Sequence, residues 1–155
     1  MKAVDRAIVF FLSMIFLFSG IDKVLHYEGF VNALRDYVLV PRGTAPYFAL
    51  PVIAVELLVG VGLLLKGTRA AAALTAAVTL AAFTVAVAVN HQFGNRGICG
   101  CWFTITLAQG TGMHLMQNLL FLGLALTAWN DSRVSRTAPP SGLQTNIQPE
   151  QGGLS

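Results

Sequence analysis

Charged residues are scarce in this chain. Only 11% of its 155 residues are Asp, Glu, Lys or Arg, whereas 55% are hydrophobic. A soluble globular domain carries about 25% charged residues, so most of this surface does not need to meet water. The basic residues stand singly beside apolar runs rather than in a stripe with aromatic residues, which argues against nucleic-acid binding. Their positions suit the flanks of membrane-spanning helices.

The chain also lacks the length for a separate soluble module, because 155 residues suit one compact domain. A clear A-x-A cleavage site is missing ahead of Ile21. Lys2, Arg6 and the apolar run behind them therefore favour a first membrane helix, with a signal peptide as the alternative interpretation.

Hydrophobic segments predict an all-α integral membrane four-helix bundle over residues 1–129, with spans at about 4–25, 47–65, 70–90 and 113–129. The first span must continue through Asp22 and Lys23, because the 15 uncharged residues before them cover only about 22 Å of a hydrocarbon core of about 30 Å. The second contains one charge, Glu56. The third is dense in alanine, which lets neighbouring helices approach closely.

Two further segments differ from the spans. Tyr27 to Val38 predicts a short amphipathic helix lying in the membrane interface, with an apolar face formed by Phe30, Leu34, Tyr37 and Val38. Residues 130–155 are dominated by Ser, Pro, Gly, Gln, Asn and Thr. We expect them to form a disordered tail on the cytoplasmic side.

The distribution of basic residues predicts the orientation. With four spans, both termini lie on one side, which then carries Lys2, Arg6, Lys66, Arg69, Arg133 and Arg136. The other side carries Lys23, Arg35, Arg42 and Arg96. Because cytoplasmic segments hold the excess of Lys and Arg, we expect cytoplasmic termini and an external loop from His91 to Gly112. A disulfide can persist in an oxidising external compartment.

That loop contains both cysteines of the chain, Cys99 and Cys101, separated by one glycine. Thiol–disulfide exchange needs an attacking thiolate and a second sulfur that resolves the mixed disulfide, and this pair supplies both. A disulfide closed over three residues is strained, and strained, exposed disulfides are the labile ones. The residues leave three interpretations open: redox exchange, a structural clip or inert thiols, and Cu(I) capture with Met113, His114 and Met116.

Polar residues inside the spans are the other candidates. Glu56 lies near the middle of the second span, where a carboxylate either carries function or fixes helix packing through a hydrogen bond. Lys23 is its expected partner, because its long stem can bend inward from the end of the first span. His91 and His114 flank the cysteine loop and either relay protons or are satisfied at the surface. Asn118 is expected to bridge helices.

The order of these features resembles the MauE family, within the DoxX-like group of four-helix membrane proteins. The resemblance covers roughly Val4 to Trp129. It rests on Gly20-Ile21-Asp22-Lys23, Phe30, Leu34, Tyr37, Pro41, Pro51, Glu56, Cys99-Gly100-Cys101 and Asn118-Leu119-Leu120. Two positions depart from the family pattern: Trp102-Phe103 stands where Phe-Gly usually follows the second cysteine, and Gln117 stands where an arginine is often found.

The resemblance implies an accessory factor of the bacterial inner membrane, with its cysteine loop in the periplasm. Such a factor matures a disulfide-rich periplasmic enzyme subunit, in that family the small subunit of methylamine dehydrogenase. Its partner is then a cysteine-rich subunit or a thioredoxin-like protein. Analogy of architecture with the membrane oxidants DsbB and VKOR makes a quinone the candidate cofactor. Glu56 and Lys23 then either hold the bundle together or polarise such a bound cofactor. A non-enzymatic scaffold or chaperone and a Cu(I)-handling protein are the competing interpretations.

Overall fold

The computed structural model describes residues 3–41, 43–93 and 111–137. Across these residues it contains helices and no strand, in the order α1 (Ala3–Leu25), α2 (Tyr27–Arg35), α3 (Ala45–Leu64), α4 (Arg69–Gln92) and α5 (Thr111–Thr137). The predicted all-α class is therefore confirmed for the part of the chain that is described.

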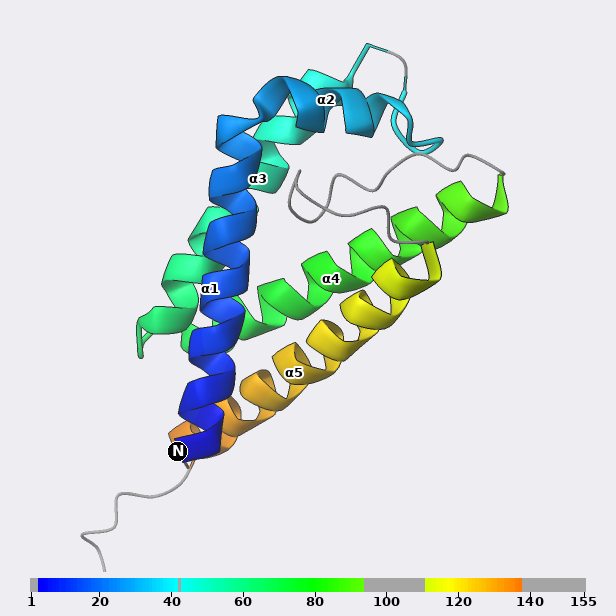
Figure 1. Cartoon of the computed structure of the whole chain (residues 1–155). Coiled ribbons are helices and arrows are strands. Elements are labelled where there is room, and N and C mark those ends of the chain that lie inside the picture. The colour runs from blue at the N-terminus through cyan, green and yellow to red at the C-terminus, as the bar shows by residue number, and fades with distance from the viewer. Residues whose placement is uncertain (1–2, 42, 94–110, 138–155) are drawn as a thin grey trace, which may run out of the picture.

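The helices form two antiparallel pairs (Figure 1). One pair is α1 and α3, and the other is α4 and α5, inclined to the first. The α2 helix lies across the end of the molecule where α1 ends and α3 begins, and α4 ends and α5 begins at this same end. We call it the α2 end. The opposite end holds the start of α1, the turn between α3 and α4, and the end of α5.

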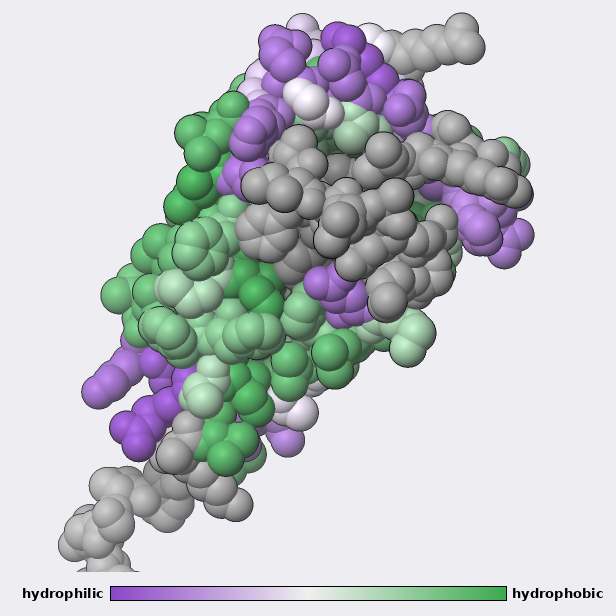
Figure 2. Space-filling model, in the orientation of Figure 1, coloured by the Kyte–Doolittle hydropathy of each residue, from purple (hydrophilic) through white to green (hydrophobic). Residues whose placement is uncertain are grey.

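Three of the described helices are long and apolar enough to cross a membrane: Val4–Leu25, Ala45–Leu64 and Arg69–Gln92. They lie close to the predicted spans 4–25, 47–65 and 70–90. Figure 2 shows hydrophobic residues over the middle of the visible face and hydrophilic residues gathered towards both ends, as a membrane protein requires. The membrane character predicted from the sequence is thus supported.

The helix expected as the fourth span, 113–129, is present as α5, but it is not among the candidate spans of the described residues. Gln117 and Asn118 lower the hydropathy of its first turns. A four-span bundle therefore stays a prediction.

The α5 helix also continues to Thr137, into the segment that we assigned to a disordered tail starting at residue 130. Local partners explain the extension. The Ser132 hydroxyl donates to the Ala128 carbonyl oxygen at 2.7 Å, and the Arg133 guanidinium lies 4.9 Å from the centre of the Trp129 ring. The rest of the predicted tail, 138–155, lies outside the described residues.

The α2 helix is amphipathic as predicted but shorter, ending at Arg35 rather than Val38. Its buried residues are Phe30 and Val31. Because the helix ends early, Val38 leaves the predicted apolar face and is exposed, while Tyr37 is buried. The location of α2 in the membrane interface stays a prediction.

Small residues form much of the core between the helix pairs. Ala73 and Ala76 on α4 and Ala125 on α5 are completely buried. They belong to one apolar cluster with Leu12 on α1 and Leu63 on α3. Because the side chain of alanine is small, the backbones of neighbouring membrane helices can approach closely where alanines face each other.

Candidate functional site

A buried ion pair joins α1 to α3. Lys23 Nζ lies 2.9 Å from Glu56 Oε1, and each side chain is only 3% exposed. Lys23 stands in the last turn of α1, where the helix C-terminus favours a positive charge. The pairing expected from the sequence is therefore present. Charges in an apolar setting need such partners, because removing them from water is costly.

Two further groups complete the surroundings of Lys23. Its ammonium donates to Ser19 Oγ at 2.6 Å, and the Ser19 hydroxyl in turn donates to Glu56 Oε1 at 3.4 Å. Across from them, the Phe30 ring of α2 lies 5.3 Å from Lys23 Nζ, within range of a cation–π interaction. The ion pair therefore connects three helices. Sequence reasoning missed Ser19, although its position one turn before Lys23 was an available signal.

The second oxygen of Glu56 differs from the first. Glu56 Oε2 is buried and has no hydrogen-bond partner among the described residues. Buried polar atoms normally have a partner. This oxygen can therefore accept one more hydrogen bond, from a water molecule or from a donor group of a ligand.

Glycines bring α1 and α3 close enough to form this site. A Cβ atom at Gly60 would lie 2.7 Å from Leu17 Cγ and 3.1 Å from the Leu17 backbone nitrogen. A Cβ at Gly20 would lie 2.8 Å from Leu57 Cδ2. The Ser13 hydroxyl donates to the Gly60 carbonyl oxygen at 2.7 Å. These contacts fix the separation of the two helices on which the ion pair depends.

The α2 helix covers the α1–α3 pair at its end. Phe30 and Val31 pack in one apolar cluster with Ala45, Ala49 and Ile53 of α3. The segment after α2 is tied to α4, because the Val38 backbone N–H donates to Asn90 Oδ1 at 3.1 Å. Asn90 was not predicted as a site residue. Its partner is 52 positions away in the sequence, and no local pattern indicates such a contact.

The remaining predicted site residues belong to the other helix pair. Asn118 on α5 is completely buried, and its role in bridging helices stays a prediction. His91 is exposed in the last turn of α4. His114 is in the first turns of α5, and its side chain lies outside the description. The predicted set therefore divides between the ion pair on α1 and α3 and residues on α4 and α5.

Both cysteines, Cys99 and Cys101, lie outside the described residues, within 94–110. The segments on either side of this stretch are described. The α4 helix ends and α5 begins at the α2 end (Figure 1). The chain thus leaves and re-enters the described structure at the end that α2 covers.

The Cu(I) interpretation receives no test from the described residues. They contain no group of three or more His, Cys, Asp and Glu residues placed to hold a metal. Of the proposed ligands, Met116 has a described side chain, and that side chain is 71% exposed.

Comparison with known proteins decides the family. The family model described as methylamine utilisation protein MauE matches residues 1–130. This chain belongs to the MauE family. The methylamine utilization protein MauE of Paracoccus denitrificans is 31% identical to it over 121 residues, which is 77% of this chain and 65% of that protein. The protein of the same name from Methylorubrum extorquens is 32% identical over 137 residues, 85% of this chain and 70% of that protein.

A third MauE, from Methylophilus methylotrophus, is 30% identical over 118 residues, which is 62% of its length. The match therefore spans about two thirds of each of these MauE proteins. No solved structure matches the chain.

Proposed function

We propose that this MauE-family protein is an inner-membrane accessory factor of methylamine utilisation that assists disulfide formation in a periplasmic enzyme subunit. The names of its relatives support the process, and three apolar helices support the location. In this proposal all four long helices span the membrane, both termini are cytoplasmic and the α2 end faces the periplasm. The substrate is a cysteine-rich subunit, such as the small subunit of methylamine dehydrogenase.

The observation that carries the redox chemistry is the Cys99-Gly100-Cys101 sequence. A thiolate of the substrate attacks one sulfur of the Cys99–Cys101 disulfide and forms a mixed disulfide, leaving the other cysteine as a thiolate. A second substrate thiolate then attacks the mixed disulfide, so the substrate gains a disulfide and the pair becomes a dithiol. Exchange with the disulfide of a thioredoxin-like protein restores the pair. Each step exchanges one sulfur–sulfur bond for another.

The described residues give no specific support to a quinone, the cofactor suggested by analogy with other membrane oxidants. Lys23, the buried cation that would polarise a quinone ring, is already engaged by Ser19, Glu56 and Phe30. The apolar pocket between α3 and α4 lies towards the end of these helices opposite the α2 end. We therefore assign reoxidation to a protein disulfide.

In this mechanism the ion pair has a positioning role. Lys23 and Glu56 hold α1 against α3, and Phe30 brings α2 onto the same cluster. Asn90 links the segment after α2 to the end of α4. Together these contacts give a fixed frame to the end at which the cysteine-bearing segment is attached.

The redox state of Cys99 and Cys101 in living cells tests the proposal. Alkylation with a mass-shifting maleimide should show a mixture of dithiol and disulfide that moves towards dithiol when the periplasmic oxidant pathway is deleted. Cys99→Ser and Cys101→Ser, made singly, should differ in trapping, because the variant that keeps the cysteine that attacks the thioredoxin-like disulfide accumulates a mixed disulfide with that protein.

A double Cys99→Ser, Cys101→Ser variant separates this function from that of a non-enzymatic scaffold. It should insert at the wild-type level while the partner subunit loses its disulfides. A partner that stays fully oxidised beside the double variant would contradict thiol exchange and favour the scaffold. Permanently reduced cysteines in the wild type would contradict it as well.

A further inference from the structure

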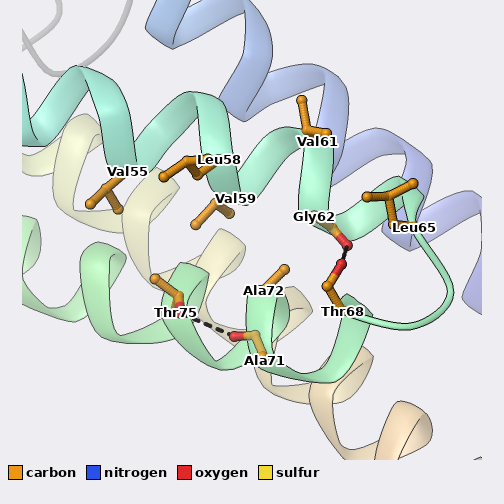
Figure 3. A pocket seen from close by; sticks show the side chains of 10 residues that line it. All are labelled: Val55, Leu58, Val59, Val61, Gly62, Leu65, Thr68, Ala71, Ala72 and Thr75. Carbon is orange, nitrogen blue, oxygen red and sulfur yellow. Dashed lines mark hydrogen bonds between the residues drawn. The ribbon is translucent and has the colours of Figure 1, made fainter.

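An open pocket lies between α3 and α4, apart from the ion pair (Figure 3). Its volume is about 400 Å³, within the range of about 300–1,000 Å³ that is usual for ligand pockets. The α3 side includes Val55, Leu58 and Gly62, and the α4 side includes Ala71 and Thr75. It therefore occupies the half of these two candidate spans that is nearer the opposite end of the molecule.

The lining of this pocket suits an alkyl chain. Its hydroxyl groups are engaged locally: Thr68 Oγ1 donates to the Gly62 carbonyl oxygen at 2.9 Å, and Thr75 Oγ1 donates to the Ala71 carbonyl oxygen at 3.0 Å (Figure 3). The other side chains that line the pocket are aliphatic. Leu58 is 72% exposed, so the pocket opens on the outer surface of the helices, where the hydrocarbon of a membrane would meet it.

The turn next to the pocket carries a basic residue. Leu65 and Thr68, on either side of this turn, line the pocket, and Lys66, between them in the sequence, is exposed. Among the described residues, the basic side chains at this opposite end are Arg6, Lys66, Arg69 and Arg133, against the acidic Asp5 and Asp131. The sequence between Glu56 and Asp131 has no acidic residue at all. An anionic group beside this turn would thus lie at an end of the molecule where basic residues outnumber acidic ones among the described residues.

We propose that this pocket binds an anionic phospholipid of the membrane, with an acyl chain between α3 and α4 and the headgroup phosphate at Lys66. The apolar lining selects the chain, and the excess of basic residues selects the charge of the headgroup. Arg69 holds the turn in place, since its Nε donates to the Leu63 carbonyl oxygen at 3.0 Å. This site is independent of the cysteines and of the proposed redox role.

Native mass spectrometry of the purified full chain in detergent, titrated with dioleoyl phosphatidylglycerol or dioleoyl phosphatidylcholine, tests the acyl-chain site. The wild type should retain phosphatidylglycerol in preference to phosphatidylcholine. Thr75→Phe fills the pocket from an exposed lining position and should abolish retention of both lipids. Val78→Phe adds the same bulk at a position on α4 that is 61% exposed and outside the pocket, and should leave retention unchanged.

Ala71→Phe is a second variant that fills the pocket, and it keeps the test valid if Thr75→Phe misfolds. The circular dichroism spectra of Thr75→Phe, Ala71→Phe and Val78→Phe should match that of the wild type. Equal retention by folded Thr75→Phe, Ala71→Phe and Val78→Phe would overturn the pocket assignment.

The headgroup contact needs its own comparison. Lys66→Gln should lower the preference for phosphatidylglycerol over phosphatidylcholine about fivefold, the factor expected when one lysine near an anionic surface is lost. Lys66→Arg should retain the preference. Arg35→Gln removes an exposed basic residue at the α2 end and should have no effect. A wild type without preference between the lipids, or a loss of preference of equal size in Arg35→Gln, would refute the role of Lys66.

Discussion

The Lys23→Met variant measures how far the fold depends on the ion pair between α1 and α3. Methionine keeps most of the side-chain length but removes the ammonium that lies 2.9 Å from Glu56 Oε1 and 2.6 Å from Ser19 Oγ. At 2.9 Å and an effective dielectric constant of about 20, the attraction between the charges is about 6 kcal/mol. Desolvation of both charges cancels much of this, so the net value of the intact pair is far smaller.

Breaking the pair is nevertheless expensive, because it leaves one charge buried without its partner. We expect Lys23→Met to lower the free energy of unfolding by about 3–5 kcal/mol and the unfolding temperature by about 10 °C. Glu56 is the reason: its Oε2 already has no hydrogen-bond partner among the described residues, and the variant also takes the ammonium from Oε1. Replacing both residues, as Lys23→Met with Glu56→Leu, should restore stability to near the wild-type value.

Reversible unfolding in mixed detergent micelles, followed by circular dichroism, gives these values as a double-mutant cycle. Glu28→Gln is the matched control, because Glu28 is an exposed carboxylate on α2, and it should stay within about 0.5 kcal/mol of the wild type. The reasoning fails if the double variant loses the sum of its two single losses, since the coupling between Lys23 and Glu56 would then be zero.

Two other contacts give further predictions. Gly60→Ala should destabilise the chain by about 1–3 kcal/mol, because its Cβ would lie 3.1 Å from the Leu17 backbone nitrogen. Gly29→Ala is the control and should not destabilise the chain, because nothing lies within 4 Å of a Cβ at that position. Equal unfolding midpoints for both variants would exclude a close approach of α1 and α3. Asn90→Leu removes the acceptor of the Val38 N–H and should accelerate hydrogen exchange at Val38; unchanged protection there would show that the contact is absent in solution.

Much of the helical fold could be predicted, because the length of an uncharged run is a direct physical requirement for crossing a membrane. The ends of helices were harder. Tyr37 and Val38 continue the apolar periodicity of α2, yet the helix ends at Arg35, and the residues after it turn towards Asn90 of α4. The polar sequence from residue 130 onward predicts a disordered tail, yet α5 continues to Thr137.

The candidate site was predictable where burial of charge forces a partner. Glu56 in an apolar span needs a cation, and Lys23 was the cation within reach. Ser19 was not predicted, since a serine in an apolar helix can simply bond to its own backbone. The close approach at Gly60 depends on how α1 and α3 pack against each other, and the sequence of either helix alone does not predict that packing.

The two helix pairs hold together by different means, and this bears on where chemistry can occur. The α1–α3 pair is locked by polar side chains, through Lys23, Glu56 and the Ser13 contact with Gly60. Buried alanines line the α4–α5 pair, and one contact of this pair with the segment after α2 joins Asn90 Oδ1 to the Val38 backbone N–H. An exchange site must let a foreign thiolate approach while its attachment points stay in place. For the exchange site that we propose, the second condition is met at α4, the helix from which 94–110 extends, because the Val38 backbone N–H donates to Asn90 Oδ1 and ties α4 to the segment after α2.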